Sequence, residues 1–236
     1  MSFERSFELE AYDPPIDTLD AATRSRLAEH WTEIEQAEIN SYRALAEQAS
    51  RLAVLGAPLS LLDRAAVVMR DEIRHARFAA RFAGLFGATI TSGAPGPLEG
   101  VDRPDPGDPA LVVTREIVVR ACVGQTLAAV EVEACANACS SERLAASLRR
   151  IASDASHHAQ LGWAALQWLA ESNPRIVPYA RRRFEQVLAQ ADAGLGGDDD
   201  TRFHAPQFGV LAPEEAARLR RRAAVKLVGP SVDSAL

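Results

Sequence analysis

Four long segments of this chain carry apolar side chains at the three- and four-residue spacing of an amphipathic α-helix, and polar residues interrupt each apolar seam near its centre. The interruptions are Glu38, the pair Glu72 and His75, Gln125, and His158. The apolar positions around them are Leu27, Trp31, Ile34, Leu45, Leu52 and Leu55; Leu62, Ala65, Val68, Ala79, Phe82 and Phe86; Val118, Ala121, Cys122, Ala128, Ala129 and Val132; and Ile151, Ala155, Gly162 and Ala165. A carboxylate buried alone costs several kcal/mol. Polar interruptions of four apolar seams therefore require a shared reason.

Helix start and stop signals divide the chain into six helices. Glycine and proline end the long segments, and capping residues or proline begin most of them. The residues expected at helix starts are Asp20, Ser60, Asp108 with Pro109, Ser140 or Ser141, and Pro213. The predicted helices run over about 20–55, 60–86, 109–139, 141–171, 177–192 and 213–228.

These helices group into one main domain with two appendages. We expect an irregular N-terminal arm over 1–19, where Pro14 and Pro15 block helix formation. The main helical domain covers 20–172, and a C-terminal extension of two helices covers 173–236. Inside the extension, the glycine- and aspartate-rich segment 194–200 is expected to be a solvated loop.

The connection lengths predict the topology. The first and second helices are joined by a very short turn, and so are the third and fourth, so each pair is antiparallel. The connection 88–107 between the pairs has twenty residues, and a chain of that length can span at most ~66 Å. A helix of 28 residues is only ~42 Å long, so this connection can cross the full length of the domain. The prediction is an all-α four-helix bundle of two hairpins and one long crossover.

In such a bundle the polar interruptions fall at one height, because each lies near the middle of its own helix. Side chains at that height meet in one layer, which is the geometry of a metal site, and the i, i+3 spacing puts Glu72 and His75 on one helix face. An internal repeat supports this reading: residues 71–76 match residues 154–159. In the repeat Asp71 aligns with Asp154 and His75 with His158, whereas Glu72 aligns with Ala155.

Several segments then resemble a known family. AEINSYRAL, LGAP, RDEIRHARF, ACVGQTLAAVE and IASDASHHAQLGW are similar to landmarks of bacterial ferritin-like non-haem diiron proteins, over about residues 30–170. The resemblance implies a ferritin-like bundle in which the first and third helices each give one glutamate, and the second and fourth each give Glu-x-x-His. Glu38, Glu72, His75 and His158 match that pattern. The family pattern has glutamate at Gln125 and at Ala155.

The resemblance also implies roles for two aspartates. In such families the residue before the Glu-x-x-His glutamate holds the histidine of the opposite helix. Asp71 would therefore orient His158, and Asp154 would orient His75; partners of this kind fix the imidazole tautomer.

The two replaced carboxylates change the expected metal content. The family's four carboxylates balance two divalent ions, whereas the two left here balance one. A second divalent ion would be buried without charge compensation. We therefore expect one iron or manganese ion rather than two at this degenerate diiron site, held by Glu38, Glu72 and His75, with His158 and the Gln125 amide as weaker ligands. A chain that binds no metal is the alternative.

Small residues predict free space beside the third and fourth helices. The expected lining of a substrate cavity is Ser41, Ala121, Ala128, Ala155 and Gly162. Three functions remain open: a metal-dependent oxidase or oxygenase acting on a small molecule; a metal-independent enzyme in which Glu72, His75 and His158 do acid–base chemistry; and a non-catalytic binding protein.

Composition restricts the partners. The formal net charge is -6, which argues against general nucleic-acid or anionic-membrane binding. The arginine clusters 181–183 and 218–222 are interpreted as solvated helix faces, with RNA binding as the less favoured alternative. The sequence has no evident signal peptide or membrane span, and three cysteines without a paired framework favour a cytoplasmic location. Ferritin-like bundles often dimerise, so a homodimer is a further alternative.

Overall fold

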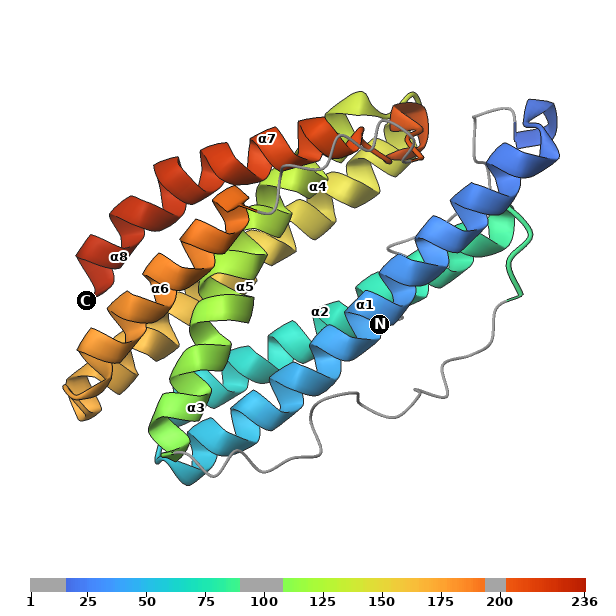
Figure 1. Ribbon diagram of the computed structural model, residues 1–236. Helices are drawn as coiled ribbons and strands as arrows, with labels where there is room; N and C mark the ends of the chain where they lie inside the picture. Colours follow the sequence, from blue (N-terminus) through green and yellow to red (C-terminus); the bar gives the residue numbers. More distant parts are fainter. Residues whose placement is uncertain (1–15, 90–107, 194–202) are drawn as a thin grey trace. The chain divides into compact units, whose positions relative to one another are not determined.

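The computed structural model describes residues 16–89, 108–193 and 203–236, and the elements in these ranges are helices, apart from one isolated β-bridge between Ala205 and Val210 (Figure 1). The all-α prediction is therefore confirmed for the described part of the chain. Most of the predicted N-terminal arm and of the 88–107 connection, and the whole predicted loop 194–200, lie outside the described residues. The chain divides into two compact units, residues 1–47 with 66–104, and residues 48–65 with 105–236.

The helices α1 (Ala21–Val54) and α2 (Leu59–Leu85) form a hairpin, and most of its length makes up the first unit together with the short 3-10 helix η2 (Ile16–Thr18). Asp20 caps α1 as predicted, because its carboxylate accepts hydrogen bonds from the Thr23 backbone N–H at 2.9 Å and from the Thr23 hydroxyl at 2.7 Å. These hydrogen bonds lower the pKa of Asp20. After α1 the chain turns at Gly56, where φ is +84°, a conformation that favours glycine.

The prediction that Ser60 caps the second helix is wrong. The helix α2 begins at Leu59, so Ser60 lies inside its first turn. The Pro58 carbonyl accepts the first hydrogen bonds, from the backbone N–H groups of Leu61 at 2.9 Å and Leu62 at 3.3 Å. The turn before the helix is tight, and the Pro58 carbonyl starts the helical hydrogen-bond pattern two residues earlier than a Ser60 cap would.

Aromatic side chains pack α1 against α2. The Trp31 ring meets the Phe82 ring edge to face at 4.6 Å and the Phe78 ring at 5.9 Å between centroids. Phe82 also contacts Phe86, at 5.2 Å. All four side chains are buried. Burial of this much aromatic surface is among the largest stabilising contributions available to two helices, and it fixes their antiparallel register.

A single helical run opens the longer part of the second unit. It consists of α3 (Pro109–Glu116), the π-helical segment η3 (Ile117–Gln125) and α4 (Thr126–Ala138). Asp108 caps it as predicted, accepting a hydrogen bond from the Ala110 backbone N–H at 2.9 Å. The sequence predicted an uninterrupted α-helix over these residues, and the wider π-helical turns were not foreseen. Such turns are rare and occur frequently at functional sites.

The helix α5 (Glu142–Ser172) runs antiparallel to this run, as expected from the short turn between them. Of the two predicted capping serines, Ser141 takes the role: its hydroxyl accepts a hydrogen bond from the Leu144 backbone N–H. The two helices approach each other closely at Gly162. A Cβ atom placed there would lie 2.5 Å from the Ala121 Cβ and 3.2 Å from the Ala121 carbonyl carbon. Only glycine fits this contact without movement of η3.

The C-terminal extension contains α6 (Ile176–Ala193), the 3-10 helix η4 (Pro206–Phe208), and a last run made of α7 (Pro213–Ala223), the π-helical segment η5 (Ala224–Val228) and α8 (Gly229–Ala235). The helix α7 packs on α4, and α6 packs on α3 and η3. The last run was expected to end near Val228 but continues to Ala235. The wide turns of η5 precede Pro230, which lacks the N–H that a regular α-helix would need there.

The predicted seams compare well with the observed burial. On α1, α2 and α5 no seam residue is exposed, and most are buried. On the third segment Val118 and Cys122 are fully buried, whereas Gln125, Ala128 and Val132 are half-buried. The helical periodicity therefore identified the inward faces correctly, and the third seam is buried only at its N-terminal end. In the described residues, no helix has the length and apolarity needed to cross a membrane.

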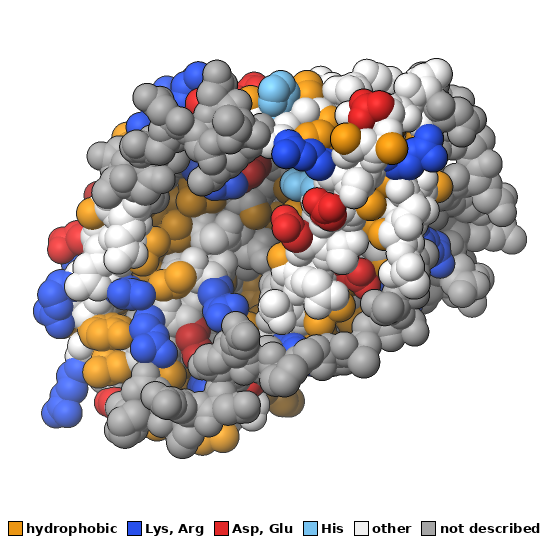
Figure 2. All heavy atoms as spheres, turned by 45° about the vertical axis from the view of Figure 1, so that its right-hand side comes forward, with side chains coloured by type: hydrophobic (Ala, Val, Ile, Leu, Met, Phe, Trp, Pro, Cys, Tyr) orange, Lys and Arg blue, Asp and Glu red, His pale blue; other side chains and the backbone are white. Residues whose placement is uncertain are grey.

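Surface charges of both signs are interspersed. On the face seen in Figure 2, Lys and Arg side chains alternate with Asp and Glu side chains and with hydrophobic patches. Within the arginine clusters, Arg220 forms a bidentate ion pair with Glu131, at 2.6 and 2.7 Å. Arg181 forms an ion pair with Asp233 at 3.4 Å. The first of these pairs joins α7 to α4, so part of the arginine-rich helix holds the extension in place.

The contact at Gly162 predicts opposite outcomes for two glycine substitutions. Gly162→Ala should lower the free energy of unfolding by about 1–3 kcal/mol, because the added methyl overlaps Ala121. Gly229→Ala is the control: its Cβ would meet nothing nearer than 3.8 Å, so helix propensity should make it neutral or stabilising by up to about 1 kcal/mol. Urea unfolding of the two variants measures both values. Equal effects would contradict the close approach of α5 to η3.

Candidate metal centre

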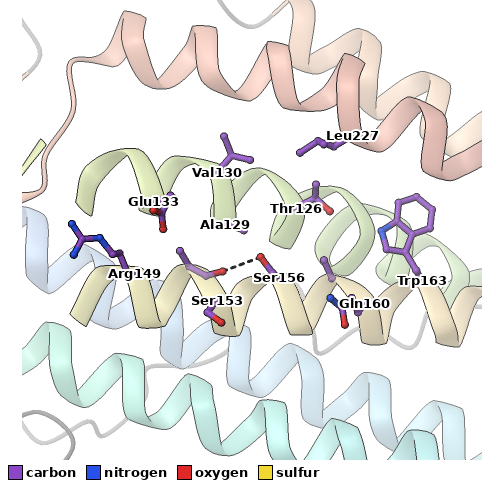
Figure 3. A pocket seen from close by; sticks show the side chains of 12 residues that line it. Thr126, Ala129, Val130, Glu133, Arg149, Ser153, Ser156, Gln160, Trp163 and Leu227 are labelled. Carbon is purple, nitrogen blue, oxygen red and sulfur yellow. Dashed lines mark hydrogen bonds between the residues drawn. The ribbon is translucent and has the colours of Figure 1, made fainter. Parts of the chain in front are cut away.

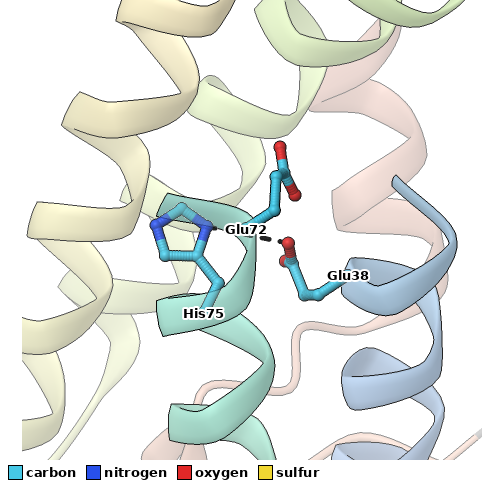
Figure 4. A group of neighbouring side chains, drawn as sticks. All are labelled: Glu38, Glu72 and His75. Carbon is cyan, nitrogen blue, oxygen red and sulfur yellow. Dashed lines mark ion pairs between the residues drawn. The ribbon is translucent and has the colours of Figure 1, made fainter. Parts of the chain in front are cut away.

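Three of the predicted ligands come together in the first unit. Glu38 projects from α1 and Glu72 and His75 from α2, and the three side chains converge between the two helices (Figure 4). One ligand atom from each, two carboxylate oxygens and an imidazole nitrogen, can be chosen so that all three lie within 4.8 Å of one another. Among the described residues, Glu38, Glu72 and His75 form the one group of three or more acidic, histidine or cysteine side chains that could hold a metal ion.

Local helix geometry and the interhelical register together build this group. The i, i+3 spacing puts Glu72 and His75 on the same face of α2. The contact between Trp31 and Phe82 lies two turns away along both helices. Counting seven residues forward from Trp31 and seven back from Phe82 brings Glu38 opposite His75, and there the His75 Nδ1 atom lies 3.6 Å from the Glu38 Oε2 atom.

The distances suit a first-row transition metal. Ligand atoms held about 2.1 Å from one ion are about 3 Å apart at right angles and about 4 Å apart on opposite sides. The 3.6 Å separation of Glu38 and His75 falls inside this range. The other separations in the group do not exceed 4.8 Å. The donor set of two carboxylates and one imidazole is one that iron and manganese accept.

Burial makes the group electrostatically costly without a cation. Glu72 and His75 are 2% and 3% exposed, and the Glu38 side chain is 22% exposed. Loss of solvation raises the pKa of Glu38 to about 7; the neighbouring Glu72 raises this pKa further, while the hydrogen bond with His75 lowers it. A bound cation would offset both the desolvation and the repulsion between the two carboxylates.

The remaining predicted ligands belong to the second unit. His158 is buried on α5 and is 3% exposed, and Gln125 is half-buried at the last position of η3. His157, next to His158, is exposed as expected. Ligation by His158 and Gln125 stays a prediction, because they and the Glu38 group belong to different units.

The predicted roles of the two aspartates also stay predictions. Asp71 lies in the first unit and forms an ion pair with Arg74 at 2.8 Å on its own helix. Asp154 is half-buried on α5 in the second unit. The proposed hydrogen bonds from Asp71 to His158 and from Asp154 to His75 would each join residues of different units.

The predicted cavity lining is placed as follows. Ala155 and Gly162 are buried on α5, and Ala121 and Ala128 are half-buried on η3 and α4. Ser41 is half-buried on α1. Ala121 and Gly162 pack closely against each other, so these two residues do not enclose free space between their helices.

Sequence reasoning missed one acidic residue near the centre. Glu35 is buried on α1, one turn before Glu38, and burial raises its pKa. Its position was visible in the sequence, because it precedes Glu38 by three residues and follows Trp31 by four. The seam was traced through Ile34 instead, which is half-buried.

Comparisons with protein-family models, with curated proteins and with solved structures found no match. A proposed function therefore rests on the geometry of the chain's own residues.

The raised pKa of Glu38 predicts a pH-dependent stability of the metal-free protein. Between its ordinary value of 4.5 and its folded value of about 7, Glu38 holds a proton in the folded state that it has lost in the unfolded state. Stability therefore falls as pH rises through this window. Replacing Glu38 by Gln should remove this part of the pH dependence, worth at most about 3 kcal/mol. Urea unfolding with chelator at pH 5 and pH 7.5 measures it.

The control for this experiment is Glu33→Gln, which changes an exposed glutamate of the same helix. This variant should keep the pH dependence of the parent chain. A Glu38→Gln protein whose stability falls with pH as steeply as that of the parent would show that Glu38 is not desolvated in the folded state.

Proposed function

We propose that this chain is a ferritin-like metal-dependent oxidase or oxygenase that acts on a small molecule and holds one iron or manganese ion through Glu38, Glu72 and His75. The observation that carries the proposal is the convergence of these three ligands from two helices, with Glu72 and His75 buried and Glu38 half-buried. Two carboxylates with little exposure are costly to keep close together unless a cation compensates them.

The charge of the group favours one ion. Glu38 and Glu72 supply two negative charges when both are ionised, which balance a single divalent cation. A three-ligand set leaves coordination positions open, which is the arrangement of catalytic rather than structural sites. His158 and Gln125 are proposed as further, weaker ligands of the same ion.

The ferritin-like arrangement is part of the proposal. It is supported by two observed antiparallel hairpins, α1 with α2 and the α3–α4 run with α5. In each hairpin, polar residues interrupt the inward faces near mid-helix. Pairing the hairpins through these faces would place Glu72, His75, Gln125 and His158 in one layer.

The roles of the protein side chains follow from their environments. A bound iron or manganese ion would supply redox chemistry with dioxygen at its open positions. Glu72 and His75 are fully enclosed on one face of α2 and would fix its position. Glu38 would complete the ligand set from α1, and part of its side chain stays accessible.

In the metal-free protein, burial raises the pKa of Glu38 to about 7, and this favours a second candidate function. A carboxyl group that titrates near neutrality in a buried site can act as a general acid or base without any metal. In that case Glu38 and His75, 3.6 Å apart, would form the proton-transfer pair of a metal-independent enzyme.

Metal analysis separates the candidates. Protein purified without chelator and then treated anaerobically with Fe(II) or Mn(II) should hold one equivalent of metal per chain after desalting. Glu72→Ala should weaken binding by roughly a hundredfold or more, because it removes a buried charged ligand. Glu33→Gln, on an exposed position of α1, is the matched control and should bind as the parent does.

Oxygen uptake tests the oxidase part independently. The iron-loaded protein should consume dioxygen faster than free Fe(II) at the same concentration, and the Glu72→Ala protein should not. Two tightly held equivalents of metal would overturn the one-ion assignment. Absence of metal would favour acid–base chemistry, and bound metal without oxygen uptake would retain the site but reject the oxidase function.

A further inference from the structure

A pocket of about 530 Å³ lies in the second unit between α4, α5 and η5 (Figure 3). Glu133 and Arg149 line one end, Ser153 and Ser156 the middle, and Trp163 and Leu227 the other end. Leu227 reaches toward α4 and α5 from the C-terminal helical run, so this part of the extension helps to enclose the pocket (Figure 3).

This pocket is separate from the proposed metal ligands. On an α-helix, residues advance by 100° each, so Ser153, Ser156 and Trp163 lie 140–160° around α5 from His158. The pocket therefore opens on the side of α5 opposite to its buried histidine.

The pocket is elongated along α5. Its lining includes Arg149 and Trp163, which are fourteen residues apart on this helix, a separation of about 21 Å along the helix axis. An extended hydrocarbon chain can cover this distance between the two ends of the pocket.

The apolar end is rigid. The Trp163 indole stacks on the Phe184 ring of α6, with centroids 5.3 Å apart and planes 3° from parallel, and Phe184 is 1% exposed. Leu227 is half exposed and lines the same end. Trp163, which is supported by Phe184, and the accessible Leu227 form an apolar surface. Covering this surface with an apolar chain is favourable, because it removes apolar area from water.

The polar end has an uncompensated negative charge. Arg149 forms an ion pair with Glu142 at 2.8 Å, so the positive charge of Arg149 is already balanced. Glu133 forms no hydrogen bond or ion pair within the described residues. Between the two ends the hydroxyls of Thr126 and Ser156 donate to backbone carbonyls, which leaves their oxygen atoms able to accept.

We propose that this pocket binds a linear primary alkylamine. The ammonium group pairs with Glu133 at the polar end, and the hydrocarbon chain lies along the small side chains of α4 and α5 toward Trp163 and Leu227. Charge complementarity selects the cationic head, and the length of the pocket between its polar and apolar ends selects a long chain.

Binding of dodecylamine to the full-length chain, measured by titration calorimetry below its micellar concentration, tests the proposal. Dodecylamine should bind at least tenfold more tightly than butylamine, because the short chain cannot reach Trp163, and at least tenfold more tightly than dodecanoate, because of Glu133. Equal affinity for the amine and the carboxylate, or no binding of dodecylamine, would overturn the proposal.

Substitutions localise the ligand. Glu133→Gln should weaken dodecylamine binding about tenfold while leaving dodecanoate unchanged or improved, and Trp163→Ala should remove the preference for the long chain. The control is Glu171→Gln, which changes an exposed glutamate of α5 outside the pocket. This variant should change neither the affinity for dodecylamine nor the preference for the long chain. A circular dichroism spectrum and melting curve like those of the parent establish that each variant is folded. Unchanged binding in a folded Glu133→Gln protein would place the amine elsewhere.

Discussion

The packing of Trp31 against Phe78 and Phe82 is the interaction on which the candidate metal centre depends. Helices are stiff over several turns, so an aromatic contact near one end fixes the rotation and register of the pair along its length. Two turns away, that register brings Glu38 opposite His75. A shift of one residue along either helix would turn one of the ligands by about 100° and separate the group.

The aromatic packing also creates the conflict that a metal ion would resolve. The apolar surfaces of α1 and α2 exclude water from their shared face, and Glu72 is as buried as the phenylalanines near it. Desolvation is therefore the first cause of the raised pKa of Glu38. The same hydrophobic surface that stabilises the hairpin makes its carboxylates costly when ionised, and it would increase the affinity for a cation that compensates them.

In the second unit, close backbone contact has the corresponding role. Gly162 allows α5 to approach η3 to a distance that no other residue would permit. This contact positions α5 with His158 on its buried side and the amine pocket on the opposite side. The ion pair of Arg220 with Glu131 then joins α7 to α4, and η5, which continues α7, brings Leu227 to the pocket. One helix thus supports a candidate ligand on one face and a binding pocket on another.

The sequence by itself determined the features that depend on neighbouring residues. The helical segments, the Asp20 and Asp108 caps, a cap at Ser140 or Ser141, and the shared face of Glu72 and His75 follow from local preferences and the helical repeat. The structure bears them out and assigns the third cap to Ser141. The short turns likewise determined that each hairpin is antiparallel.

Tertiary structure decided what depends on contacts between distant residues. The 3.6 Å approach of His75 to Glu38, the burial of Glu35, the π-helical turns of η3 and the pocket beside Trp163 had no sufficient signal in the sequence. Each results from the way side chains on separate helices fit together, and packing of that kind is set by the shape of both partners, whereas a local pattern records only one of them.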